Sequence, residues 1–126
     1  MQSDLSKIDA SKIASAGENP YSELTYLSGF KEGSYSIINP TTNLGFGLIW
    51  DVSLFKYLWM WEERNGILDS PWWGRVYTVA LEPWTAKWTN NPEEGIKNGD
   101  WERLEADESL DTTIKESSST LFKFPS

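Results

Sequence analysis

The stretch that decides the fold is residues 45–88, GFGLIWDVSLFKYLWMWEERNGILDSPWWGRVYTVALEPWTAKW. It holds seven of the eight tryptophans and two apolar runs, the second of which ends at Glu82, immediately before Pro83. Tryptophan is costly to leave in water and offers a flat surface for stacking, so a cluster marks either an aromatic core or a binding cleft. Seven tryptophans in one stretch favour a partly open cleft.

The composition limits the classes of function. At 126 residues the chain has the size of one domain. The 19 acidic and 11 basic residues give a net charge of -8, which opposes binding to nucleic acids and to anionic membranes. Cysteine and histidine are absent, so any proton transfer falls to carboxylates, tyrosine or lysine. We expect no cofactor and no metal, because the sequence has neither metal-ligand spacing nor a phosphate-binding glycine loop.

The segments outside the central stretch give no sign of export or membrane insertion. The first 20 residues lack the apolar run of a signal peptide, and no segment approaches the ~20 apolar residues that span a bilayer. The expected location is therefore cytoplasmic, and we also expect that an N-terminal part of the protein lies outside this chain.

Short runs of alternating apolar and polar residues predict an all-β chain of about seven strands and under about one fifth helix. The expected architecture is an antiparallel β-sandwich over residues 21–126, with residues 1–20 as an N-terminal arm or linker. A hairpin is expected from the first two strands, and a long loop over residues 83–100. The expected strands cover residues 22–28, 34–39, 44–50, 56–63, 75–82, 101–104 and 110–124.

Two of these strands carry the features of a binding groove. In residues 56–63, Trp59 and Trp61 share one face while Leu58 and Met60 share the other, which predicts a central strand that is covered on both sides. In residues 75–82, small side chains alternate on the face that ends at Glu82, which suits the floor of a groove.

Other residues near these strands have simpler expected roles. Trp72 and Trp73 lie in a segment rich in turn-forming residues, where a place on the rim of a binding site explains them. The remaining acidic residues of this region are expected on the solvated surface: Glu62, Glu63, Glu93 and Glu94.

Carboxylates together with aromatic side chains are typical of carbohydrate sites. The C–H faces of a sugar ring lie on aromatic planes, while charged groups hold its hydroxyls. Carboxylates can also perform acid or base chemistry at the anomeric carbon.

Three runs resemble the C-terminal part of the aldose 1-epimerase family, the galactose mutarotase-like sugar-binding proteins. They are GFGLIWDVSLFKYLWMW, PWWGRVYTVALEPWT and LEADESLDTTI, and the resemblance extends from about Asp4 to Phe124. Its most specific piece, VALEPWT, is similar to the segment in which the catalytic glutamate of the family follows a hydrophobic strand. The resemblance implies the C-terminal half of the large galactose mutarotase-like β-sandwich, called a supersandwich.

The same resemblance implies a role for Glu82 as the general base that removes the proton of the anomeric hydroxyl. In the family a histidine protonates the ring oxygen, but this chain has no histidine. Trp84 also stands where a glutamine often follows the glutamate by two positions.

Two hypotheses follow. The first is an aldose 1-epimerase-like isomerase, or a fragment of one, that uses Glu82 as its base. The second is a non-catalytic carbohydrate-binding or self-assembling β-sandwich protein. In both, the expected ligand is a sugar, and bare aromatic faces and strand edges predict a homo-oligomer. The expected substrate-binding residues are Trp59, Trp61, Trp73, Arg75 and Trp84.

Overall fold

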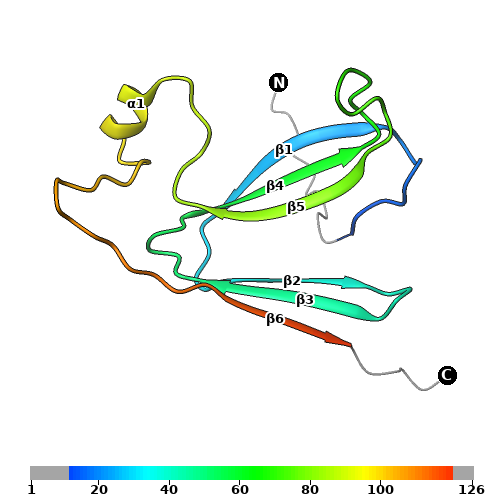
Figure 1. Ribbon diagram of the computed structural model, residues 1–126, viewed down its shortest axis with the longest axis horizontal. Helices are drawn as coiled ribbons and strands as arrows, with labels where there is room; N and C mark the ends of the chain where they lie inside the picture. Colours follow the sequence, from blue (N-terminus) through cyan, green and yellow to red (C-terminus); the bar gives the residue numbers. More distant parts are fainter. Residues whose placement is uncertain (1–11, 121–126) are drawn as a thin grey trace, which may run out of the picture. The chain divides into compact units, whose positions relative to one another are not determined.

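The computed structural model describes residues 12–120, which form six strands and one short helix (Figure 1). The protein is mostly β, with two three-stranded antiparallel sheets in the strand orders β1-β4-β5 and β2-β3-β6. This architecture is consistent with a β-sandwich and confirms the all-β prediction. The elements are β1 (Tyr21–Ser28), β2 (Gly33–Asn39), β3 (Leu44–Trp50), β4 (Tyr57–Arg64), β5 (Tyr77–Trp84), α1 (Pro92–Lys97) and β6 (Lys115–Thr120).

The chain divides into two compact units, which are described separately. The first comprises the residues up to Glu23 together with Trp61–Val79. The second comprises Leu24–Met60 and the residues from Ala80 onward. The second unit therefore contains the whole β2-β3-β6 sheet and helix α1.

The β2-β3-β6 sheet is built on a hairpin between β2 and β3, with Gly33 opposite Trp50 and Asn39 opposite Leu44. The Asn39 side chain closes the turn, since its Oδ1 accepts the backbone N–H groups of Thr41 at 2.9 Å and Thr42 at 3.1 Å. Asparagine stabilises turns in this way. Strand β6 pairs antiparallel with the other edge of β3 (Figure 1).

The hairpin predicted for residues 22–28 and 34–39 is wrong. Strand β1 belongs to the sheet with β4 and β5, whereas β2 pairs with β3. The turn after Asn39 is closed by hydrogen bonds to the Asn39 side chain, and it pairs β3 with β2. Strand β1 instead joins a sheet with strands that come later in the chain.

The small core of the second unit follows the alternation expected from the sequence. Leu58 and Met60 on β4 are buried, as is Trp50 at the end of β3. The Trp50 ring packs edge-on against Phe30 at 5.6 Å between ring centroids. Its Nε1 donates to the carbonyl oxygen of Phe55 at 3.1 Å. The indole N–H therefore keeps a partner in the core, as buried polar groups require.

The segment predicted as a loop over residues 83–100 contains two regular elements. Strand β5 continues to Trp84, and α1 covers Pro92–Lys97. The side chain of Asn91 caps α1 by accepting the backbone N–H of Glu94 at 3.3 Å, and Pro92 occupies the first turn. Because proline has no N–H to lose there and asparagine is a preferred cap, the sequence NPEEG is itself a helix start that the loop prediction overlooked.

The two strands predicted at the C-terminal end need correction. Residues 101–104 form no strand, and the last strand begins at Lys115 rather than at residue 110. A turn intervenes, in which the Glu108 N–H donates to the Glu105 carbonyl at 3.1 Å and Asp107 adopts a φ of 66°. Residues 121–124 of the predicted strand lie outside the described residues.

The β2-β3 hairpin exposes several apolar side chains: Ile38, Leu44, Phe46 and Ile49. Such a surface is what the expected self-association requires, and that association stays a prediction. Within residues 12–120, no helix is both long enough and apolar enough to span a membrane.

Candidate functional site: an aromatic cleft

A cleft of about 480 Å³ opens on the second unit. Its walls are four tryptophans: Trp59 from β4, Trp84 from the end of β5, and Trp88 and Trp101 from the segment that follows. This volume lies within the range of about 300–1,000 Å³ typical of small-ligand sites. The other lining residues are Thr85, Ala86, Lys87, Thr89 and Glu102. We call this set the aromatic cleft.

Trp59 and Trp84 stack on each other in the lining of the aromatic cleft. Their rings stack at 4.5 Å between centroids with an interplanar angle of 20°. Tyr26 packs edge-on against Trp59 at 5.2 Å, and Trp59 Nε1 donates to the carbonyl of Ala86 at 2.8 Å. Trp59 is thus held in place, while Trp84 and Trp88 remain 43% and 69% exposed. The exposed rings offer stacking surface to a ligand.

Helix α1 positions Trp101. The indole lies against Gly95, where a Cβ atom would come within 2.7 Å of Trp101 Nε1 and 2.8 Å of its Cδ1. The backbone N–H of Trp101 also donates to the Gly95 carbonyl at 3.1 Å. Only glycine leaves room for the indole ring at this position. The contribution of Trp101 to the cleft therefore depends on packing against α1, a helix that was not predicted from the sequence.

Two charged residues line the aromatic cleft, Lys87 and Glu102, and other polar groups contact them or lie nearby. Lys56 Nζ pairs with Glu102 Oε1 at 2.7 Å. The hydroxyl of Tyr57 donates to Asp100 Oδ1 at 2.8 Å, and the Lys87 ammonium lies 5.2 Å from the centre of the Tyr57 ring. The hydrogen bond to Asp100 raises the pKa of Tyr57, with smaller contributions from burial and from the carboxylate charge. Tyr57 therefore keeps its proton and serves as a donor.

Glu82 lies beside the aromatic cleft. It is exposed near the end of β5, and its Oε2 accepts a hydrogen bond from Trp84 Nε1 at 2.9 Å. The carboxylate is thus attached to a ring that lines the cleft. The structure brings together three of the residues predicted for the site, namely Glu82, Trp59 and Trp84.

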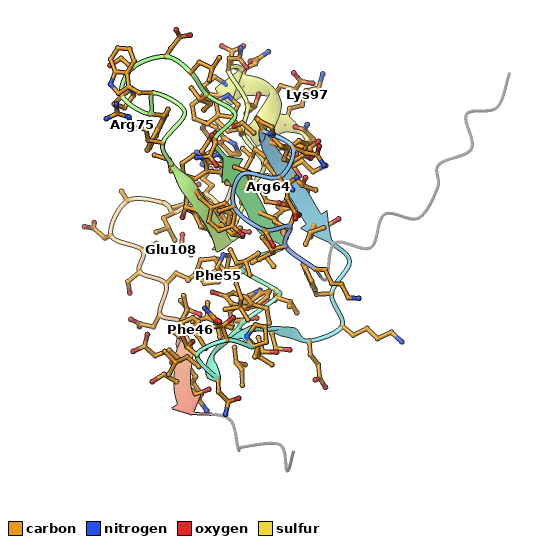
Figure 2. All side chains as sticks on the ribbon, turned by 90° about the vertical axis from the view of Figure 1, so that its right-hand side faces the viewer. Phe46, Phe55, Arg64, Arg75, Lys97 and Glu108 are labelled. Carbon is orange, nitrogen blue, oxygen red and sulfur yellow. The ribbon has the colours of Figure 1, made fainter. Side chains whose placement is uncertain are left out.

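The other three predicted residues, Trp61, Trp73 and Arg75, belong to the first unit. Trp61 packs edge-on against Trp72 at 5.6 Å. Trp73 and Arg75 lie on the loop between β4 and β5. Figure 2 shows Arg75 on this loop, and Trp73 is 61% exposed. Their part in sugar binding stays a prediction.

The expected surface location of Glu63 is wrong, because its side chain is fully buried in the first unit. Its Oε1 accepts the backbone N–H groups of Gly66 at 2.7 Å and Ile67 at 3.0 Å. The other carboxylate oxygen, Oε2, is buried without a hydrogen-bond partner among the described residues. Burial alone would raise the pKa of Glu63, but the nearby Ser22 hydroxyl and these backbone N–H groups outweigh burial and lower the pKa. Glu63 is therefore ionised and closes the loop that follows β4.

Glu62 is only partly exposed, contrary to the same expectation. Its side chain is 19% exposed and lies 3.3 Å from Arg64 Nε. The Arg64 guanidinium also lies over the Tyr21 ring, at 4.4 Å from its centre. By contrast, Glu93 and Glu94 are exposed in the first turn of α1, as expected.

Seven of the nine lining residues were absent from the predicted site, among them Trp88, Trp101 and Glu102. The tryptophan content of residues 83–101 was the sequence feature that could have indicated them, because aromatic side chains in an otherwise polar segment need a surface to pack against. Within the described part of the chain, no group of three or more Asp or Glu side chains is placed to hold a metal ion.

Comparisons of the chain with protein-family models, with curated proteins and with solved structures found no match.

Proposed function

We propose that this protein binds carbohydrate in the aromatic cleft. The observation that carries the proposal is the group of four tryptophans around one cavity, with the rings of Trp84 and Trp88 exposed. The C–H face of a pyranose can stack on such a ring. Lys87, Glu102 and the threonine hydroxyls can then bond its hydroxyl groups, the combination of apolar walls and few polar groups that ligand sites use.

Titration of simple aldoses against tryptophan fluorescence tests this proposal. We expect dissociation constants of about 1 mM or weaker. Trp84→Ala should weaken binding by about fivefold to tenfold, the worth of one stacked aromatic contact. Phe46→Ala is the matched control, because Phe46 is an exposed aromatic residue on β3 that does not line the cleft. Equal weakening in both variants, or no fluorescence change with any aldose, would reject the cleft as a sugar site.

A second candidate function is anomer exchange of the bound sugar. The favouring observation is the exposed carboxylate of Glu82 at the end of β5, bonded to the cleft residue Trp84. The resemblance of VALEPWT to the base segment of aldose 1-epimerases supports the same role. We further propose that the two sheets correspond to the C-terminal half of the galactose mutarotase-like supersandwich, with the protonating histidine on another part of a complete protein.

Polarimetry of a freshly dissolved aldose tests the role of Glu82. In this proposal Glu82 removes the proton of the anomeric hydroxyl, and the ring oxygen needs an acid that the histidine-free chain does not supply. We therefore expect little or no acceleration by this chain alone. Glu82→Gln should retain sugar binding and abolish any acceleration that is observed. Rapid mutarotation that persists unchanged in Glu82→Gln would refute the assignment of the base.

A further inference from the structure

We infer that the preferred ligand of the aromatic cleft is a sugar that carries a protonated amino group. This inference rests on the proposed carbohydrate binding and adds the charge of the ligand to it. The first argument is the cleft wall itself. The face of an indole ring is electron-rich and attracts cations, so four tryptophans around one cavity favour a positive ligand over a neutral or negative one.

The second argument is the balance of charged groups around the cleft. Two charged residues line the cleft, Lys87 and Glu102, and Glu102 is paired with Lys56. Two further carboxylates are bonded to aromatic residues beside it, those of Glu82 and Asp100. Glu82 and Asp100 accept hydrogen bonds from neutral groups, the Trp84 N–H and the Tyr57 hydroxyl, which do not cancel their negative charge.

The chain as a whole is also negatively charged, with a net charge of -8. A negative surface potential raises the local concentration of cations and repels anions. A sugar ring with an ammonium group can therefore use both properties of the site, because its C–H face stacks while its charge meets electron-rich rings and carboxylates.

The experiment compares sugars that differ in charge but share a ring. Glucosamine, N-acetylglucosamine, glucose and glucuronate are titrated by tryptophan fluorescence at low and at high salt. We expect glucosamine to bind about threefold to fivefold more tightly than glucose, the worth of one exposed cation–aromatic contact. N-acetylglucosamine, whose nitrogen is neutral, should lose this advantage, and glucuronate should bind most weakly. High salt should reduce the glucosamine advantage.

Variants assign the preference to the cleft. Asp100→Asn removes a carboxylate beside the cleft but keeps an acceptor oxygen for the Tyr57 hydroxyl, so it should reduce the preference for glucosamine while glucose still binds. Glu32→Gln, an exposed glutamate outside the cleft lining, is the matched control and should keep the preference.

The outcomes distinguish failure of the charge preference from failure of the proposed carbohydrate binding. Equal binding of glucosamine and glucose, or tighter binding of glucuronate, would overturn the charge preference and leave carbohydrate binding intact. Choline is titrated in the same way. Binding of choline as tight as that of glucosamine, with no binding of glucose, would show a site for cations without a requirement for a sugar, and would overturn both. Absence of binding by every sugar would also overturn both.

Discussion

Gly33→Ala is expected to lower the free energy of unfolding by about 1–3 kcal/mol, the usual cost of added atoms in a filled position. Gly33 is buried and lies opposite Trp50 in the β2-β3 ladder. A Cβ atom there would lie 2.4 Å from the Trp50 carbonyl oxygen and 2.7 Å from its Nε1. The oxygen is a backbone atom, so the ladder must shift to admit the methyl group. The indole must also move, which endangers its hydrogen bond to the Phe55 carbonyl.

Gly47→Ala is the matched control, because Gly47 lies on β3 of the same sheet. A Cβ atom at Gly47 would meet only the Ser117 Oγ at 3.4 Å and the Tyr35 carbonyl oxygen at 3.5 Å, which are ordinary contacts. Alanine also loses less conformational entropy on folding than glycine. The variant should therefore be unchanged or more stable by about 0.5 kcal/mol. Urea unfolding followed by tryptophan fluorescence measures both, and similar stabilities would contradict the crowding at Gly33.

The strands were predictable where side chains alternate, and their pairing was not. The run LGFGLIW gave β3 with the observed bounds, and the predicted bounds of β4 and β5 differ from the observed ones by one or two residues. Alternation is a local property that each strand carries by itself. Pairing depends on which turn closes, and the later turn is closed by two hydrogen bonds to the Asn39 side chain. The first hairpin was therefore misassigned.

The aromatic cleft was predictable in part for the same reason. Trp59 and Trp84 stand on strands with a clear pattern, and they stack. Trp101 reaches the cleft only because α1 forms and presents Gly95 to its ring. The burial of Glu63 could not be predicted from the sequence pattern, because glutamate is usually exposed. It is buried here because the backbone N–H groups of the following turn need an acceptor, a requirement that depends on the loop conformation.

Glu63→Ala is expected to lower the melting temperature by roughly 5–10 °C, because it leaves two backbone donors without their acceptor. Those donors are the N–H groups of Gly66 and Ile67. The turn has no room to rearrange inward, since a Cβ atom at Gly66 would lie 2.5 Å from the Tyr21 carbonyl carbon. Glu23→Ala, at an exposed position of the same unit, is the control and should change the melting temperature little. Equal losses in the two variants would contradict the role of Glu63.

The acid dependence of stability separates the charge of Glu63 from its shape. Hydrogen bonds lower its pKa below the ordinary 4.5 in spite of burial, so the folded state binds its proton less readily than the unfolded state. The stabilisation is therefore complete above pH 4.5 and is lost as the pH falls through the folded-state pKa. Glu63→Gln keeps an acceptor oxygen but does not titrate. In urea unfolding measured at neutral pH and again well below pH 4.5, the original chain should lose more stability on acidification than Glu63→Gln. If both chains lose the same stability on acidification, Glu63 carries no charge in the folded state, and its shape alone closes the turn.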